Sequence, residues 1–321
     1  MQGASHTRLP RVAEPEIPAA VRTRLDGVLR RLDCTAGRTC AVTALEGGLT
    51  NVNFKVDTGE RVVVVRLSSL DQDLLAIDRE AEHTNSRRAA ESGAAPDVVD
   101  YLPGEGVLVI AWVEGHTYES ADLRVEENLL RVASACRLLH AGQRFDGDFD
   151  MFAIQQRYLR LVQEHGFRLP DRYLEFMPAV DRIRAALAVQ AERSVPCNND
   201  LLAANFIDDG ERVWIIDYEY AGNNDACFEL GNIWSESTLD GEHLVTLVDA
   251  YFGEHRDDMI ARARLFGLLS KYGWTLWASI QTAVSPIEFD FWAWGMEKYD
   301  RAVAEFDDPA LDSLLDRAAA R

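Results

Sequence analysis

Residues 196–205 read Pro-Cys-Asn-Asn-Asp-Leu-Leu-Ala-Ala-Asn, and residues 215–222 read Ile-Ile-Asp-Tyr-Glu-Tyr-Ala-Gly. Asp200 is followed five positions later by Asn205. Asp217 stands at the end of the second strand of a short apolar hairpin that joins the two segments. Three polar residues are therefore spaced around one hairpin, and this pattern decides the fold.

Each of these polar residues has an ordinary structural explanation. Asp200 could cap a helix, Asn205 could be a polar loop residue, and Asp217 could end a strand. Their joint spacing is much rarer than its parts. It matches phosphoryl-transfer sites, where one aspartate receives the proton of the attacking hydroxyl while an asparagine and a second aspartate hold Mg²⁺ against the phosphates. The spacing therefore favours phosphoryl transfer.

Composition indicates a globular chain of two lobes. The sequence has 321 residues, 47% of them apolar, which is enough for two cores. The formal net charge of -20 argues against a nucleic-acid partner, because such proteins usually present a basic face. The acidity favours solubility, and attraction of a cationic substrate is the alternative.

The five cysteines are scattered and form no Cys-x-x-Cys pair, so a disulfide framework or zinc site is not expected. Neither a signal peptide nor a membrane-spanning run is recognisable, so we expect no membrane insertion. These features predict a cytoplasmic protein. The oligomeric state stays open, with a homodimer as one candidate assembly.

The N-terminal part predicts strands around a glycine pair. Val52, Phe54 and Val56 alternate with polar residues, and residues 61–67 form an apolar run that ends near Arg66. Gly47-Gly48 could let the backbone approach a phosphate, although an ordinary hairpin turn is the favoured explanation of the pair taken alone. Helical periodicity is seen over residues 18–32, 78–92, 125–140, 152–162, 173–191, 244–252, 262–277 and 291–306.

Several motifs together resemble the choline/ethanolamine kinase family, within the wider aminoglycoside-phosphotransferase-like kinases. The segment 199–205 is similar to the family's Asn-Asp-Leu-x-x-x-Asn loop, and 216–222 to its Ile-Asp-(aromatic)-Glu-Tyr block. Gly-Gly-Leu-Thr-Asn at 47–51 resembles its nucleotide loop, and Trp-Thr-Leu-Trp at 274–277 its Trp-x-x-Trp helix. The resemblance covers most of the chain.

The resemblance implies an α+β, protein-kinase-like fold of two lobes. Residues 1–113 would form a small nucleotide-binding lobe with an antiparallel sheet and a helix, and residues 114–321 a larger, mainly helical lobe that binds the acceptor. It further implies ATP and Mg²⁺ as cofactors, Asp200 as the catalytic base, and Asn205 and Asp217 as Mg²⁺ ligands. The implied nucleotide-binding residues are Gly48, Thr50, Asn51, Arg66, Glu82 as the partner of Arg66, and Ala111 and Val113 at the adenine hinge.

One position departs from the family pattern. The histidine that precedes Asn-Asp in the family is Asn198 in this chain. In related kinases that histidine acts mainly as a structural pin, and an asparagine can also donate a hydrogen bond. We therefore expect activity, while a non-catalytic binding protein with the same fold remains an alternative.

The expected acceptor is choline, which would be phosphorylated to phosphocholine. Aromatic faces bind quaternary ammonium groups, and an acidic residue adds charge. Core packing between helices is the ordinary explanation for the aromatic residues of this chain that could form such a site. Ethanolamine, whose N–H groups favour carboxylates, and an aminoglycoside or amino sugar remain alternatives. The implied acceptor-binding residues are Glu219, Tyr220, Glu236, Trp274, Trp277, Phe291 and Trp294.

Overall fold

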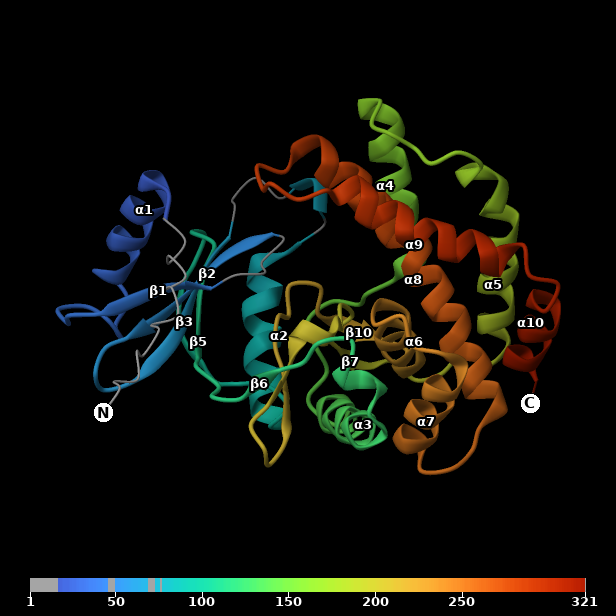
Figure 1. Ribbon diagram of the computed structural model, residues 1–321, viewed down its shortest axis with the longest axis horizontal. Helices are drawn as coiled ribbons and strands as arrows, with labels where there is room; N and C mark the ends of the chain where they lie inside the picture. The colour runs from blue at the N-terminus through green and yellow to red at the C-terminus, as the bar shows by residue number, and fades with distance from the viewer. Residues whose placement is uncertain (1–16, 46–49, 69–72, 76, 321) are drawn as a thin grey trace, which may run out of the picture. The chain divides into compact units, whose positions relative to one another are not determined.

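The computed structural model describes residues 17–45, 50–68, 73–75 and 77–320 (Figure 1). Contacts within the chain divide it into two compact units. The first comprises the described residues of Met1–Ser69 together with Val99–Trp112, and the second those of Leu70–Val98 and Val113–Arg321. The predicted composition, an antiparallel sheet near the N-terminus and a larger helical part, is confirmed.

The first unit contains a five-stranded sheet in the order β1-β2-β3-β5-β4. Neighbouring strands run antiparallel from β1 through β2 and β3 to β5. Alternate valines of the central strand β3 are buried, as expected for a pleated strand whose side chains point to opposite faces. The strands are β1 (Ala41–Leu45), β2 (Asn51–Asp57), β3 (Val62–Ser68), β4 (Val98–Leu102) and β5 (Val107–Ala111).

Helix α1 (Ala19–Leu29) completes the core of this unit. Leu25 and Val28 belong to the same buried cluster as Phe54 and Val65 of the sheet. Arg24 fastens the helix, because its guanidinium donates to the carbonyl oxygens of Ser68 at 2.9 Å and Glu105 at 2.7 Å. The expected small lobe of sheet and packed helix thus receives its helix from the N-terminal segment.

Helix α2 (Arg79–Ser92) groups with the second unit, although the sequence analysis assigned it to the N-terminal lobe. The physical reason is its buried Asn85. The side chain of Asn85 donates to the carbonyl oxygens of Asp146 (3.1 Å) and Ala221 (3.0 Å), and accepts the Asp146 N–H (2.7 Å). These bonds tie α2 to the segments around the candidate site.

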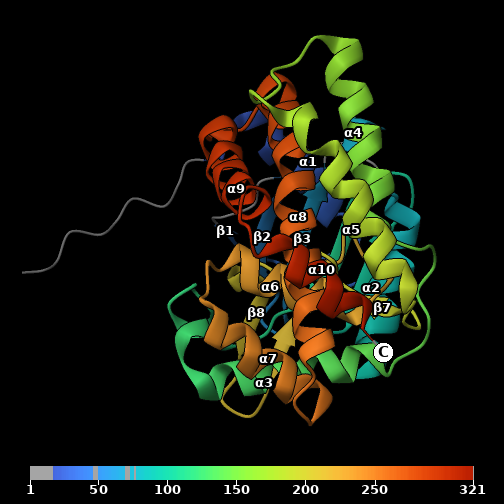
Figure 2. The same ribbon diagram turned by 90° about the vertical axis from the view of Figure 1, so that its right-hand side faces the viewer.

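The second unit is mainly helical, with α8 in contact with α4, α6, α9 and α10 (Figure 2). Among the described residues, no helix combines the length and apolar character needed to cross a bilayer. The helices are α3 (Glu126–His140), α4 (Met151–His165), α5 (Met177–Val189), α6 (Ala226–Glu236), α7 (Gly241–Phe252), α8 (Asp257–Val284), α9 (Phe291–Phe306) and α10 (Leu311–Ala319). The short 3₁₀ turns are η1 (Asp73–Leu75), η2 (Asp122–Arg124), η3 (Tyr173–Phe176) and η4 (Ala203–Asn205).

Five short strands accompany these helices: β6 (His116–Thr117), β7 (Val195–Cys197), β8 (Phe206–Asp208), β9 (Val213–Ile215) and β10 (Gly222–Asn224). They form a ladder of β10 with β7 and a second sheet in the order β6-β8-β9. Because β7 precedes and β8 follows the segment 198–205, the two ladders hold both ends of that segment.

Two glycines allow α8 to approach its neighbours closely. A Cβ on Gly231 of α6 would lie 2.0 Å from the carbonyl oxygen of Ala263 in α8, and a Cβ on Gly295 of α9 would lie 2.5 Å from the Ala278 Cβ in α8. Any larger residue would force the helices apart. Helices α6, α8 and α9 carry the predicted acceptor residues other than Glu219 and Tyr220, so these close approaches position that part of the site.

Candidate active site

The two motif segments meet because their flanking strands pair. Strand β7 pairs antiparallel with β10, with Cys197 opposite Gly222, and β8 pairs antiparallel with β9. The N–H of Ile216 also donates to the Asn205 carbonyl oxygen at 3.0 Å. Consequently the loop with Asp200 and the strand end with Asp217 form one structure, as their spacing predicted.

Asn198 holds the loop that contains Asp200 to the strand end that contains Asp217. Its Nδ2 donates to the carbonyl oxygens of Ile216 at 3.1 Å and Asp217 at 2.7 Å. Its Oδ1 accepts the N–H of Asp200 at 3.1 Å. The side chain is fully buried, so these bonds are not exchanged with solvent. Asparagine thus makes the type of structural bond that we expected at this position.

The neighbouring Asn199 fixes the turn of the loop. Its φ of 70° lies in the left-handed region, which asparagine tolerates better than most residues. Its Nδ2 lies 3.0–3.2 Å from three carbonyl oxygens, those of Cys197, Tyr220 and Gly222. Asn199 therefore satisfies backbone groups on both sides of the site, and we assign it a structural role that the motif alone did not reveal.

The residues predicted to bind Mg²⁺ fit that ion chemically. The Nδ2 of Asn205 donates to the Asp200 carbonyl oxygen at 2.7 Å, so a metal ion would be bound through Oδ1. Asp217 has a φ of 63°, a left-handed conformation that is rare outside glycine and is concentrated at functional sites. Carboxylate and amide oxygens are the hard ligands that Mg²⁺ prefers.

The electrostatic environment of Asp200 is strongly acidic. Burial raises the pKa of its carboxyl well above the ordinary value. The negative charges of Glu236, Asp217 and Glu219 raise this pKa further, and the positive charge of Lys298 lowers it. An apo site with several carboxylates around one base is the environment that a bound divalent cation would neutralise.

Arg79 connects the start of α2 to this acidic cluster. Its Nη1 lies 2.6 Å from a carboxylate oxygen of Glu82 and 3.3 Å from one of Glu219. All three side chains are largely buried, and the single positive charge of the arginine is shared between the two carboxylates. Glu82 was expected to pair with Arg66. That pairing stays a prediction, because Arg66 belongs to the other unit.

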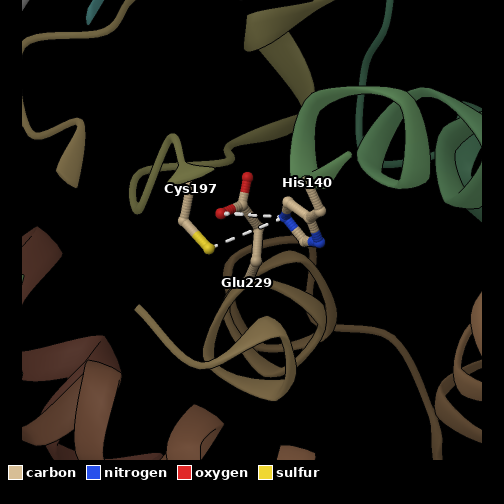
Figure 3. A group of neighbouring side chains, drawn as sticks. All are labelled: His140, Cys197 and Glu229. Carbon is tan, nitrogen blue, oxygen red and sulfur yellow. Dashed lines mark hydrogen bonds and ion pairs between the residues drawn. The ribbon is translucent and has the colours of Figure 1, made fainter. Parts of the chain in front are cut away.

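A second cluster lies next to the loop that contains Asp200 and consists of His140, Cys197 and Glu229 (Figure 3). The His140 Nε2 lies 3.6 Å from both the Cys197 Sγ and a Glu229 carboxylate oxygen. The other Glu229 oxygen accepts the Asn198 N–H at 3.1 Å. These donor atoms lie within 4.8 Å of one another and could hold a metal ion, separate from the predicted Mg²⁺ ligands.

His140 is the last residue of α3. Its Nδ1 lies 2.7 Å from the Tyr251 hydroxyl, so both ring nitrogens have partners. Sequence reasoning therefore missed its position behind the loop. The sequence held one indication of this position: Cys197, the residue that contacts His140, directly precedes Asn198.

The predicted nucleotide residues lie in the first unit, with three exceptions. Arg66 is buried in β3, with Leu108 of β5 opposite, and Asn51 begins β2 and donates to the Thr50 hydroxyl at 3.0 Å. Ala111 ends β5. The first exception is Gly48, which lies outside the described residues. The others are Val113 and Glu82, which belong to the second unit.

The predicted acceptor residues form a continuous aromatic cluster. The ring centroid of Trp277 in α8 lies 5.5 Å from that of Trp294 and 5.7 Å from that of Phe291, both in α9. Its Nε1 donates to the Tyr220 hydroxyl at 2.9 Å, and the Tyr220 ring lies 4.9 Å from Trp274. Most of these rings are buried against each other, so core packing accounts for part of the cluster, while Trp294 is half-buried.

Glu236, the predicted partner of an acceptor cation, already has a cation of the protein. The Nζ of Lys298 donates to its Oε2, and the same Nζ lies 4.1 Å from the centroid of the Trp294 ring. Sequence analysis did not single out Lys298. Its spacing could have revealed it, because Phe291, Trp294 and Lys298 follow one another at three and four residues on one face of α9.

Comparisons with known proteins identify the family of this chain. The model of the choline/ethanolamine kinase family matches residues 42–248. Ethanolamine kinase 1 of Mus musculus is 25% identical over an alignment of 299 residues that covers 79% of this chain and 80% of that protein. The similarity therefore extends over most of both chains.

Solved structures extend the comparison. A choline/ethanolamine kinase family protein from Mesorhizobium loti aligns with a TM-score of 0.82 and 29% identity, covering 93% of this chain and 99% of that one. Choline kinase LicA from Streptococcus pneumoniae aligns with a TM-score of 0.76 and 21% identity, covering 92% and 100%. The predicted protein-kinase-like fold is thereby confirmed.

Proposed function

This chain belongs to the choline/ethanolamine kinase family, and we propose that it transfers the γ-phosphoryl group of ATP to the hydroxyl group of choline. Members of this family are phosphotransferases that act on an alcohol. The observation that carries the proposal is the arrangement of Asp200, Asn205 and Asp217. The Asn198 side chain bonds to Asp200 and Asp217, and the Asn205 side chain bonds to the Asp200 carbonyl oxygen.

In the proposed reaction Asp200 orients the acceptor hydroxyl and receives its proton. Asn205 and Asp217 would hold Mg²⁺, which supplies charge neutralisation for the phosphate groups. Arg66 and the segment at Thr50 would bind the phosphates, and Ala111 would contact adenine at the hinge. Most of the catalysis in such a site comes from positioning and electrostatic stabilisation, so no covalent enzyme intermediate is needed.

The aromatic cluster supports choline as the acceptor. A trimethylammonium group has no N–H donor, so it gains most from aromatic faces. Trp294 already carries the Lys298 ammonium 4.1 Å from its ring centroid, which shows that this face attracts a cation in the folded protein. Trp277 packs beside Trp294. It also donates a hydrogen bond to Tyr220, which belongs to the motif segment 215–222.

Ethanolamine is the second candidate acceptor, and the carboxylates near Asp200 favour it. The charges of Glu219 and Glu236 both raise the pKa of Asp200, so both lie close to the site. A primary ammonium could donate N–H bonds to such groups, which a quaternary ammonium cannot do. A reducing cytoplasm is the compartment we propose, in keeping with five free cysteines.

An ADP-release assay with choline, ethanolamine and an aminoglycoside as separate acceptors tests the proposal. We expect Mg²⁺-dependent turnover with choline that exceeds turnover with the other two. Turnover with ethanolamine but not choline would replace the proposed acceptor. Asp200→Ala should lower the rate by at least about a hundredfold; an undiminished rate would refute the assignment of the base, and no turnover by the unmodified protein would favour a binding role.

A further inference from the structure

The cation subsite of the pocket contains a lysine of the protein itself. Lys298 and Glu236 form an ion pair in which the two side chains are only 3% and 2% exposed. The Lys298 Nζ also lies over the Trp294 ring, 4.1 Å from its centroid. A carboxylate and an aromatic face are the two groups that an acceptor's ammonium would use. One lysine engages both of them.

The pair lies close to the reacting centre. The charges of Glu236 and Lys298 both act on Asp200, in opposite directions. Trp294, which the Lys298 ammonium covers, packs against Trp277 at 5.5 Å between ring centroids. The pair therefore belongs to the acceptor side of the site and is not a remote structural bridge.

The fold holds this ion pair in place. Lys298 follows Trp294 by one turn of α9, and Glu236 is the last residue of α6. Both helices pack against α8, and Gly295 lets α9 approach it closely. A buried pair with fixed geometry persists, because removing either partner leaves an uncompensated charge in a poorly solvated place.

The consequence is that the Glu236–Lys298 pair presents no net charge to an acceptor. The single negative charge of Glu236 is balanced by the single positive charge of Lys298. An acceptor's ammonium would have to displace Lys298 from Glu236 and Trp294, or share the carboxylate with Lys298 through Oε1, which has no hydrogen-bond partner among the described residues. Either course weakens the electrostatic preference for a cationic acceptor.

We propose that Lys298 determines acceptor specificity by competing with the acceptor's ammonium group for Glu236 and Trp294. This inference rests on the proposed function, and it narrows the substrate class. The pocket recognises a small alcohol by its hydroxyl group and hydrocarbon shape, and it distinguishes weakly between a cationic alcohol and a neutral one of the same shape.

The test uses choline and 3,3-dimethylbutan-1-ol, which has the same shape with a carbon in place of the charged nitrogen. The measured quantity is the ratio of kcat/KM for choline to that for the neutral alcohol. Lys298→Met keeps the hydrocarbon stem and removes the ammonium. We expect the ratio to rise at least about tenfold, the change that 1.4 kcal/mol produces, chiefly through a lower KM for choline.

Two further variants serve as controls. Lys271→Met removes a comparable lysine, which is 1% exposed, is paired with Glu305 and lies 4.8 Å from the Trp234 ring centroid. Its ratio should stay at the wild-type value. Lys298→Arg keeps the positive charge and should also stay near that value. Each ratio comes from a single preparation, so the folded fraction of a variant cancels.

Calorimetric titration of the same two alcohols gives the ratio of dissociation constants independently of turnover. A rise in Lys298→Met alone supports the inference. An unchanged ratio, or an equal rise in Lys271→Met, overturns it. If the wild-type protein phosphorylates no alcohol while the binding ratio rises in Lys298→Met, the proposed function fails and the role of Lys298 in cation binding stands.

Discussion

Replacement of Asn198 tests how the catalytic loop is held. Asn198→Ala removes three hydrogen bonds: two to the carbonyl oxygens of Ile216 and Asp217, and one from the N–H of Asp200. At about 1 kcal/mol for each bond, the free energy of unfolding should fall by about 3 kcal/mol. The fall would approach about 6 kcal/mol if the abandoned backbone groups stay buried and unpaired.

Loss of the pin should affect catalysis as well as stability. The same bonds set the position of Asp200 relative to Asp217, and a displacement of about 1 Å can lower the rate about a hundredfold. We therefore expect a fall in kcat of that order for Asn198→Ala, measured by ADP release under saturating ATP. Urea unfolding followed by tryptophan fluorescence measures the stability change.

Two more substitutions at Asn198 separate shape from hydrogen bonding. Asn198→Asp keeps the shape but places an acceptor oxygen against two carbonyl oxygens, so it should be at least as harmful as alanine. Asn198→His restores the family residue and one N–H donor, so it should retain more activity than alanine. Asn128→Ala removes a single bond of 2.9 Å to Asp122 and provides the control for one lost side-chain amide, with kcat unchanged. Wild-type kcat and stability in Asn198→Ala would refute the pin.

In metal-free protein, Asp200→Asn should raise the thermal unfolding temperature at neutral pH, while kcat with Mg²⁺ falls at least about a hundredfold. The folded-state pKa of Asp200 is raised, so the native protein holds a proton that is lost as pH rises, and stability decreases through that pH window. Melting curves in EDTA should therefore show a smaller difference in unfolding temperature between acidic and neutral pH for the variant than for the wild type. An equal difference would contradict this explanation. Gly231→Ala should reduce the free energy of unfolding by about 3 kcal/mol, because its Cβ would lie 2.0 Å from the Ala263 carbonyl oxygen. The matched Gly241→Ala, with nothing within 4 Å, should leave it unchanged or slightly higher, and equal urea midpoints for the two variants would contradict the close packing.

Local patterns predicted local structure well. The helix expected over residues 78–92 is observed as Arg79–Ser92, capped by Asp78, whose side chain accepts the N–H groups of Glu80 and Ala81. The helix expected over 291–306 is observed with the same bounds. Both predictions rest on apolar spacing and end signals within one segment, which is the information that a sequence carries most directly.

Contacts between distant segments were predicted less well. The helix expected over residues 262–277 extends over Asp257–Val284, because buried packing against neighbouring helices continues past the most apolar part. Helix α2 was assigned to the wrong unit, since the partners of its Asn85 lie 61 and 136 positions away in the chain. Such long-range hydrogen bonds leave no periodic signal along the sequence.

The motif residues lie together as their spacing indicated, but their supporting partners could not be deduced. The resemblance implied that Glu236 binds the acceptor. In the structure its carboxylate is hydrogen-bonded to Lys298, 62 positions later in the chain. An ion pair of this kind depends on how α6 and α9 meet across α8, which is set by packing and not by either local pattern.

The two departures of this chain from the expected site differ in their physical consequences. At position 198 an asparagine, in place of the family's histidine, donates to the carbonyl oxygens of Ile216 and Asp217. The geometry that the proposed proton and phosphoryl transfer needs can therefore be kept without an imidazole. At Lys298 a positive charge enters a subsite where the acceptor's own charge was expected. The first exchange preserves the positions of reacting groups, whereas the second alters the charge that an acceptor meets. Catalysis and acceptor choice can therefore vary separately in this fold, because the pin and the ion pair involve different segments.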